Sequence, residues 1–458
     1  MQVERFSLNL KLMWGGKVLY YHGENTKVNM KKVAKTDGVV ANIVGKQSIP
    51  KFFKIRQRFD DFKILDIEDE IQKKLQRSGT LDRIKPGQSI AITAGSRGVA
   101  NIDKITKYIV DAVKSQGANP FIVPTMGSHG GATAEGQKEV LETNGITEKI
   151  MGCPIRSSME TVQVGVSEFG KPVRIDKYAN EADGIIVVGR VKFHTAFTGK
   201  YESGLLKMIT IGLGKQFGAE ICHADSFKYM EKNVTSIARE ALKQCKIIFG
   251  LALVENAYDE TMRIEAIPAE KFFDEEPALL EVAKSNMASI LFKEFDVLIV
   301  DEVGKNISGS GMDPNITGSF PTPYKTGGAI KQRIVVLDIS EESHGNGTGL
   351  GAADFTVQRA FDKMDFEMTY PNALTAVVTL NAKLPITLAN DMLAIKAAIQ
   401  TCSGIDCNNA RIVRIKNTLE LGEILISEGL LEEAKINPRI EVLEEPVELP
   451  FDENGNLF

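Results

Sequence analysis

Short β-branched runs alternate with amphipathic stretches along most of the chain from about Lys85 onward. Ser89–Thr93 has the composition of a strand, and Asn101–Ser115 repeats isoleucine and valine at helical spacing, with Asn101 in the position of an N-cap. Chains that alternate strands and helices in this way form parallel sheets covered by helices. The sequence therefore predicts an α/β fold with mainly parallel sheets flanked by helices.

The alternation runs in two series, which indicate two domains. The first series predicts strands at Phe121–Val123, Gly184–Val188, Ile247–Val254 and Met262–Ile267, a hairpin over Thr161–Ile175, and helices over Ala134–Glu142, Tyr201–Ala224 and Val234–Gln244. The second series predicts strands at Val297–Val300, Ile334–Leu337, Leu374–Leu380 and Ala410–Ile415, and helices over Ala353–Met364 and Asp391–Ala398. The pattern restarts after a charged helix near Glu294. We therefore expect domains at 1–294 and 295–431, and an acidic tail at 432–458 that packs as an extended strap or frays.

Charge and hydropathy exclude several classes of protein. Lysine plus arginine number 55 and aspartate plus glutamate 60, which argues against a general binder of nucleic acid or anionic membrane. Apolar stretches are far shorter than the roughly 20 residues that a membrane span needs. The amino terminus lacks the apolar core of a secretory signal, and the five scattered cysteines fit reduced thiols. We expect a cytoplasmic protein that acts on a small molecule.

Two of the five histidines, His129 and His194, directly follow predicted strands, as does Arg97. Ligands of open parallel sheets bind beyond the carboxyl ends of the strands, so three successive strands would direct these side chains into one crevice. A facing histidine pair can act as acid and base on two sides of one carbon, and arginine can bind a carboxylate or phosphate. Taken singly, each histidine fits a surface or structural residue equally, and Arg97 fits a surface ion pair.

The segment from Gly199 to His223 carries three lysines and five glycines. Glycine costs about 1 kcal/mol relative to alanine inside a helix, so this accumulation indicates close approach of the backbone to a ligand or to another helix. The glycine spacing misses the dinucleotide fingerprint, and the segment does not follow a strand. A nucleotide-dependent dehydrogenase is therefore disfavoured.

Three motifs in this order resemble the nickel-dependent lactate racemase family: Gly127–Thr133 (GSHGGAT), Gly189–Phe197 (GRVKFHTAF) and Tyr201–Met208 (YESGLLKM), the last continuing to His223. The resemblance is strongest over about Ile92–Ala224. It implies two α/β domains with a catalytic cleft between them. It also implies a nickel-pincer nucleotide, which is a pyridinium mononucleotide with two sulfur groups that binds nickel and is tethered to a lysine.

The resemblance assigns roles by position. Lys207 corresponds to the tethering lysine and His223 to the nickel ligand, while His129 and His194 correspond to the acid/base pair. Arg97 resembles an arginine that follows the first active-site strand, and we expect it and its neighbour Ser96 to contact the cofactor. Imidazole suits nickel, and a lysine amine is a natural nucleophile for a covalent link. Lys200 is the alternative tether if the three-residue insertion after His194 is misplaced.

The chain departs from the lactate enzymes where the substrate is expected. Ala94 replaces the aspartate of an Asp-x-Thr-Arg motif, and the sole tryptophan, Trp14, lies far from the second domain. The second domain instead has two loops rich in hydroxyl, amide and cationic donors, Lys305–Gly311 and Ser343–Gly349, which include His344. Such loops fit either contacts to a sugar acid or turns rich in Gly and Asn. Lys305 is the stronger candidate for binding the substrate carboxylate.

The leading hypothesis is an isomerase that inverts the C2 hydroxyl carbon of a 2-hydroxy acid, with a sugar acid favoured over lactate. The alternative hypothesis for the substrate is that the protein racemises lactate or another short 2-hydroxy acid. A non-catalytic binder or carrier of the nickel cofactor is the alternative of another class. In each case the enzymes that synthesise the cofactor are expected partners.

Overall fold

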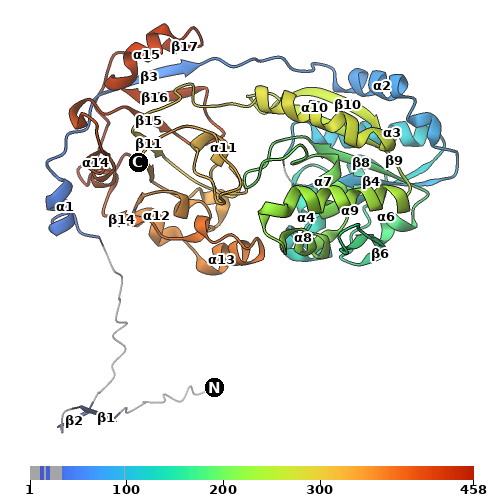
Figure 1. The fold of residues 1–458 in the computed structure, drawn as a ribbon, viewed down its shortest axis with the longest axis horizontal. Coiled ribbons are helices and arrows are strands. Elements are labelled where there is room, and N and C mark those ends of the chain that lie inside the picture. Colours follow the sequence, from blue (N-terminus) through green and yellow to red (C-terminus); the bar gives the residue numbers. More distant parts are fainter. Residues whose placement is uncertain (1–10, 15–16, 21–33, 97) are drawn as a thin grey trace.

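A computed structural model describes residues 11–14, 17–20, 34–96 and 98–458. Two sheets dominate the architecture, one of five strands and one of eight, and each is flanked by helices (Figure 1). We call the five-stranded sheet with its helices the first domain and the eight-stranded sheet with its helices the second domain. The predicted α/β class, with mainly parallel sheets, is confirmed.

The first sheet has the strand order β10-β9-β8-β4-β5 and is parallel except at β10. Its strands are β4 (Ser89–Ala94), β5 (Asn119–Pro124), β8 (Gly184–Arg190), β9 (Ile247–Glu255) and β10 (Thr261–Pro268). Successive residues of β8 enter different cores: Ile185 and Val187 pack with one cluster, and Ile186 and Val188 with another. Burial on both faces explains why this strand is a continuous apolar run.

Helices cover both faces of the first sheet. They are α2 (Ile67–Ser78), α3 (Ile102–Ser115), α4 (Ala134–Thr143), α5 (Glu148–Met151), α6 (Lys177–Glu181), α7 (Leu205–Lys207), α8 (Lys215–His223), α9 (Met230–Gln244) and α10 (Phe272–Ser285). The predicted hairpin is present as β6 (Thr161–Val166) and β7 (Pro172–Asp176). Asn101 precedes α3 as expected, but in a left-handed conformation whose side chain makes no cap hydrogen bond.

The second sheet has the order β14-β13-β12-β11-β15-β16-β3-β17. Its strands are β3 (Phe52–Gln57), β11 (Val297–Val300), β12 (Arg333–Val336), β13 (Phe355–Val357), β14 (Ile386–Leu388), β15 (Ile412–Ile415), β16 (Glu423–Ser427) and β17 (Ile440–Val442). The helices are α1 (Val39–Val44), α11 (Pro314–Thr317), α12 (Gln358–Lys363), α13 (Phe366–Thr375), α14 (Asp391–Gln400) and α15 (Leu431–Ile436). A separate hairpin joins β1 (Lys11–Trp14) and β2 (Lys17–Tyr20).

The structure differs from the expected organisation near the start of the chain. Strand β3 lies within the region assigned to the first domain, yet it pairs with β16 and β17 in the second sheet. The segment 432–458 supplies most of α15 and the strand β17, and beyond them Val447 bridges to Phe52 and Leu449 is buried in the core of the second domain. Pairing between distant segments is set by tertiary contacts that local periodicity does not contain.

Two local predictions in the second domain were wrong. The segment Ala353–Met364, expected as a helix, begins with the buried strand β13 and becomes helical only from Gln358. The segment Leu374–Leu380, expected as a strand, contains the end of α13 and the turn that follows it. Short apolar runs fit both structures, so periodicity alone does not distinguish them.

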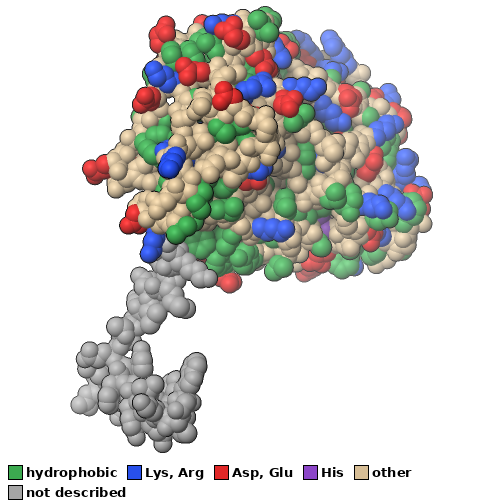
Figure 2. Space-filling view, turned by 60° about the vertical axis from the view of Figure 1, so that its left-hand side comes forward, with side chains coloured by type: hydrophobic (Ala, Val, Ile, Leu, Met, Phe, Trp, Pro, Cys, Tyr) green, Lys and Arg blue, Asp and Glu red, His purple; other side chains and the backbone are tan. Residues whose placement is uncertain are grey.

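Charged side chains of both signs are interspersed over the face drawn in Figure 2. Within the described ranges, no helix combines the length and apolar character needed to cross a bilayer.

Candidate active site

The loops that follow β4 and β5 meet at the carboxyl edge of the first sheet. Ser96 Oγ lies 2.6 Å from His129 Nδ1, a hydrogen bond between the two loops. A second link is made by Thr125, whose hydroxyl and backbone N–H both donate to the carbonyl of Ala94. His129 is exposed to solvent. Arg97, expected at the same edge, lies outside the described residues.

His194 follows β8 in a loop that holds its ring from two sides. Its Nδ1 accepts a hydrogen bond of 3.1 Å from the backbone N–H of Ala196. Its ring centroid lies 4.6 Å from that of Phe197 and 5.6 Å from that of Phe227. The ring is therefore fixed by packing as well as by hydrogen bonding.

His223, at the end of α8, packs against the same Phe227 ring at a centroid distance of 5.3 Å. Its Nδ1 lies 2.6 Å from the carbonyl of Ala219, which accepts the Nδ1–H of the neutral ring. This tautomer leaves Nε2 as the nitrogen with a lone pair, the arrangement typical of metal-binding histidines. Burial lowers the pKa of His223, and the positive charge of Lys207 lowers it further. A neutral ring is the form that binds a metal.

Lys207 closes the short helix α7 and leads into a π-helical turn, Met208–Gly212. Its Nζ donates to Ser203 Oγ at 3.3 Å. Lys200 is exposed instead, with its Nζ over the ring of Tyr201. The expected long helix over Tyr201–Ala224 is thus broken, and π-turns of this kind are frequent at functional sites.

Glu276 from α10 anchors the start of α7. Its buried carboxylate accepts the backbone N–H of Leu206 at 3.1 Å. A Cβ added to Gly204 would lie 2.6 Å from this carboxyl carbon, so a larger residue there would displace the Glu276 carboxylate from its present position. Burial raises the pKa of Glu276 to about 7.

The loops after β4 and β5 also pack on the segment that carries Lys207 and His223. A Cβ added to Gly127, whose φ is +61°, would lie 3.3 Å from Ile211 Cγ2 and 3.6 Å from Ala219 Cβ. A Cβ on Gly95 would lie 3.5 Å from Met208 Cε. Close backbone approach is therefore one use of the glycines that the sequence accumulates here.

A buried network behind His129 was not identified from the sequence. The fully buried Lys215 forms an ion pair of 3.2 Å with Asp176 and donates to the Pro124 carbonyl and to Gln137 Oε1. The Gln137 amide donates in turn to the carbonyls of Gly127 and His129. Lys215 has a φ of +54°, which non-glycine residues seldom adopt. A lysine inside a glycine-rich apolar segment was the available signal for this network.

The two loops of the second domain lie against each other. Ser343 Oγ accepts the backbone N–H of Lys305 and donates to Asn306 Oδ1, and a Cβ on Gly311 would collide with the Thr348 carbonyl. Lys305 Nζ donates to the Gly309 carbonyl at 2.7 Å. His344 is exposed in a left-handed turn. Many of the donors that suggested substrate binding are therefore used within the loops themselves, which favours the turn interpretation for Ser343–Gly349.

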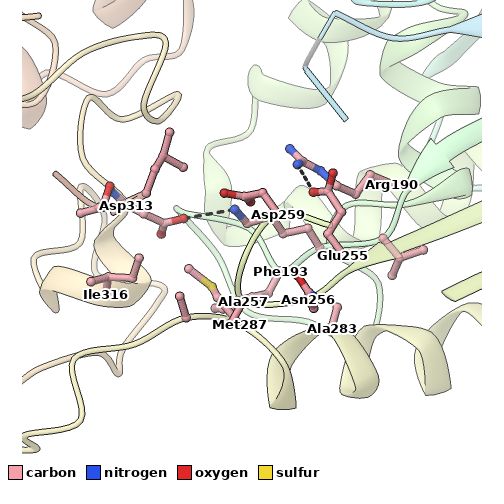
Figure 3. Close-up of a pocket in the computed structure, with 15 residues that line it drawn as sticks. Arg190, Phe193, Glu255, Asn256, Ala257, Asp259, Ala283, Met287, Asp313 and Ile316 are labelled. Carbon is pink, nitrogen blue, oxygen red and sulfur yellow. Dashed lines mark hydrogen bonds and ion pairs between the residues drawn. The ribbon is translucent and has the colours of Figure 1, made fainter. Parts of the chain in front are cut away.

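A pocket lies between the two domains beyond the ends of β8 and β9 (Figure 3). Charged and polar side chains from both domains line it: Arg190, Lys192, Glu255, Asn256, Asp259, Asp313 and Thr418. Lys192 Nζ lies 3.6 Å from Asp313 Oδ2 across the domain boundary, and Arg190 pairs with Glu255. Burial raises the pKa of Asp259. Phe193 lines this pocket and directly precedes His194 in the sequence.

Within the described residues, no group of three or more His, Cys, Asp and Glu side chains is arranged to hold a metal ion. The site consists instead of His194 and His223, which pack on the Phe227 ring, with Lys207 close enough to His223 to affect its pKa and His129 held by Ser96. Fold and site together define a two-domain α/β protein with a histidine-bearing site at the carboxyl edge of its first sheet.

Comparisons with known proteins agree with this description. Residues 61–234 match the family model of the lactate racemase N-terminal domain. The structure is similar to the lactate racemase apoprotein from Thermoanaerobacterium thermosaccharolyticum, with 16% sequence identity, a TM-score of 0.50, and coverage of 81% of this chain and 99% of that chain. A protein from Thermotoga maritima matches with 12% identity, a TM-score of 0.45, and coverage of 59% of this chain and 70% of that chain. A search of curated proteins found no match.

The matched region contains Ser96, His129, His194, Lys207 and His223. The match over residues 61–234 to the lactate racemase N-terminal domain model confirms the resemblance to this family that was drawn from the motifs.

Proposed function

We propose that the protein inverts the C2 hydroxyl carbon of a 2-hydroxy acid, with His129 and His194 as the acid/base pair. The observation that carries the proposal is the Phe227 ring, against which both His194, from the loop after β8, and His223, from the end of α8, pack. The match of residues 61–234 to the lactate racemase N-terminal domain supports a racemase or epimerase.

The hydrogen bonds of the two histidines suit proton transfer. The Ser96 hydroxyl can either donate to His129 Nδ1 or accept from it, so this ring can exchange tautomers and both give and take a proton at Nε2. The N–H of Ala196 holds His194 Nδ1 as an acceptor, so the neutral His194 ring carries its proton on Nε2. His194 is therefore set as the proton donor and His129 as the more adaptable base.

The donor set fits a nickel-pincer nucleotide. His223 presents Nε2 as a nickel ligand, since its Nδ1 bonds to Ala219, and Lys207 provides an amine for the covalent link. Ser96 and Arg97 complete the proposed contacts. When bound, this group would supply the hydride acceptor and donor for the carbinol carbon. The enzymes that make the cofactor are the proposed partners.

For the substrate we propose a 2-hydroxy acid longer and more polar than lactate, such as a sugar acid. The polar lining of the interdomain pocket, which includes Phe193 directly before His194 in the sequence, supports this choice. Lys305, which does not line that pocket, is proposed separately as the carboxylate contact. A site built to bond extra hydroxyls leaves its own polar groups unpaired around lactate, which can lower kcat/KM by orders of magnitude.

The test begins with protein produced alongside the cofactor-synthesis enzymes. Intact mass should show a covalent adduct and metal analysis about one nickel per chain, because a single imidazole binds nickel weakly without the pincer. His223→Ala should lose the nickel while circular dichroism shows an unchanged fold. Tight nickel binding by cofactor-free protein would contradict the proposed site.

Loaded protein is then incubated in heavy water with lactate, malate and four- to six-carbon aldonates, and NMR follows inversion. Inversion with little deuterium at C2 supports hydride return, whereas full incorporation indicates simple deprotonation. Fast lactate racemisation without aldonate turnover would refute the substrate class. A cofactor-loaded protein without turnover on any acid would favour the carrier hypothesis.

A further inference from the structure

We propose that Glu202 and Lys325 form a clamp through which the second domain positions His194. Glu202 lies on the first domain, eight residues after His194, and Lys325 lies on the second. The functional part of this inference rests on the proposed role of His194 as an acid/base residue. The structural part, that docking of the second domain orders the His194 loop, stands independently.

Glu202 holds the His194 loop from inside. Its side chain is 0% exposed, and Oε2 accepts the backbone N–H of His194 at 2.6 Å. The other carboxylate oxygen accepts the N–H of Gly199 at 3.3 Å. One carboxylate thus fixes both ends of the segment 194–199.

A buried carboxylate requires a positive partner, and this one receives two of different origin. Lys325 Nζ lies 3.0 Å from Oε2, the same oxygen that bonds to His194, and the Lys325 side chain is only 5% exposed. Lys284 Nζ lies 3.4 Å from Oε1, but its side chain is 29% exposed and it also contacts Glu281 at 3.0 Å. Lys325 is therefore the partner coupled more closely to His194.

The segment around Lys325 also bonds to the backbone of the same loop. Asn315 Nδ2 donates to the His194 carbonyl at 3.4 Å, and Thr322 Oγ1 donates to the Ala196 carbonyl. The N–H of Thr198 donates to the Tyr324 carbonyl at 3.2 Å. The segment 315–325 of the second domain therefore bonds to the loop at every second residue from 194 to 198.

Docking of the second domain has a direct consequence for catalysis in this arrangement. If segment 315–325 withdraws, the loop loses these backbone bonds, and Glu202 loses the cation next to the oxygen that holds His194. The His194 ring is then less well placed relative to Phe227 and His223. The acid/base site is complete only when the two domains are in contact.

The test compares Lys325→Met with Lys284→Met in cofactor-loaded protein, because both remove a cation from the same carboxylate. Lys325→Met should raise amide hydrogen exchange at residues 194–199 by about tenfold, whereas Lys284→Met should change it little. For inversion of the accepted acid, Lys325→Met should lower kcat by about tenfold or more with a smaller change in KM. Lys325→Arg should restore much of both.

Thr322→Val provides a second test with little change in volume, and it should loosen the same loop to a smaller extent. Equal effects of Lys325→Met and Lys284→Met, or unchanged exchange at 194–199 in Lys325→Met, would overturn the clamp. If amide exchange is faster in Lys325→Met and is not restored in Lys325→Arg, Lys325 acts through packing and not through its charge. That outcome would also refute the proposal. If the wild-type protein inverts no hydroxy acid, the proposed function fails, while the exchange experiment still decides whether the clamp exists.

Discussion

In both sheets, glycine-rich loops of similar composition follow the carboxyl ends of the parallel strands, but the two domains use these loops differently. In the first domain, hydrogen bonds and packing hold histidine rings: Ser96 contacts His129, Ala196 contacts His194, and Ala219 contacts His223. In the second domain, Ser343 bonds to Lys305 and Asn306, so the loops stabilise one another. Hydrogen-bond donors in a loop therefore indicate a ligand site only when the loop itself does not require them.

The largest expected effect concerns covalent attachment in the first domain. Lys207→Ala should abolish the mass adduct of cofactor-loaded protein, because the amine supplies the link. Lys200→Ala is the matched control, since Lys200 is exposed and lies over Tyr201. An adduct that persists in Lys207→Ala but vanishes in Lys200→Ala would show that the tether has been assigned to the wrong lysine.

Histidine substitutions test the comparison between the two edges directly. His129→Gln and His194→Gln should each lower kcat by about 10² to 10⁴, the usual contribution of a positioned acid or base. His344→Gln should leave kcat and KM nearly unchanged, since its turn is held by neighbouring residues, whereas Lys305→Met should raise KM if it contacts the carboxylate. Steady-state kinetics on the best acid provides the measurement. A large loss in His344→Gln would make the second edge catalytic as well.

Removing the buried cation behind His129 should have a smaller but clear effect on stability. Lys215→Met leaves Asp176 buried without its partner, which is expected to cost about 3 to 5 kcal/mol. Urea unfolding measures the loss, and Lys228→Met, at an exposed site, is the control. Loss of stability no greater than in the control would show that this network is dispensable.

The smallest expected effect is a pH dependence of the free energy of unfolding, which arises from Glu276 at the start of α7. The folded-state pKa of Glu276 is raised to about 7 from an ordinary value of 4.5, so folding favours its protonated form. Its contribution to stability is complete below about pH 4.5 and is lost as the pH rises through about 7. Glu276→Gln should therefore flatten the unfolding free energy between these values, by at most about 3 kcal/mol. An identical pH profile in wild type and variant would contradict the raised pKa.

Sequence reasoning predicted the first domain well because its signals are local. Gly184–Val188 is apolar throughout and became β8, and the hairpin over Thr161–Ile175 became β6 and β7. The pairing of β3 with β16 and β17 was not predicted, because hydrogen bonds between segments hundreds of residues apart leave no local pattern. The strand predicted at Leu374–Leu380 failed because an apolar run also suits the end of a helix.

The candidate site was predicted as a set of residues but not as a geometry. Strand-end placement indicated His129 and His194, and the family motifs indicated Lys207 and His223, whose chemical roles stay predictions. Phe227 was missed, because an aromatic residue beyond a helix carries no signal of its own in one sequence. The Glu202 carboxylate was missed as well, since its partners come from both domains and its burial is known only from the fold.

Phe227 links two side chains that come from different segments of the first domain. Its ring packs against those of His194 and His223, at centroid distances of 5.6 and 5.3 Å. Each imidazole is also held by its own hydrogen bond, to Ala196 and to Ala219 respectively. A change in side-chain size at position 227 would therefore alter the packing of both imidazoles at once while leaving their hydrogen-bond partners in the sequence. Phe227 is accordingly a shared contact, through which one substitution would act on two histidines that lie 29 residues apart in the chain.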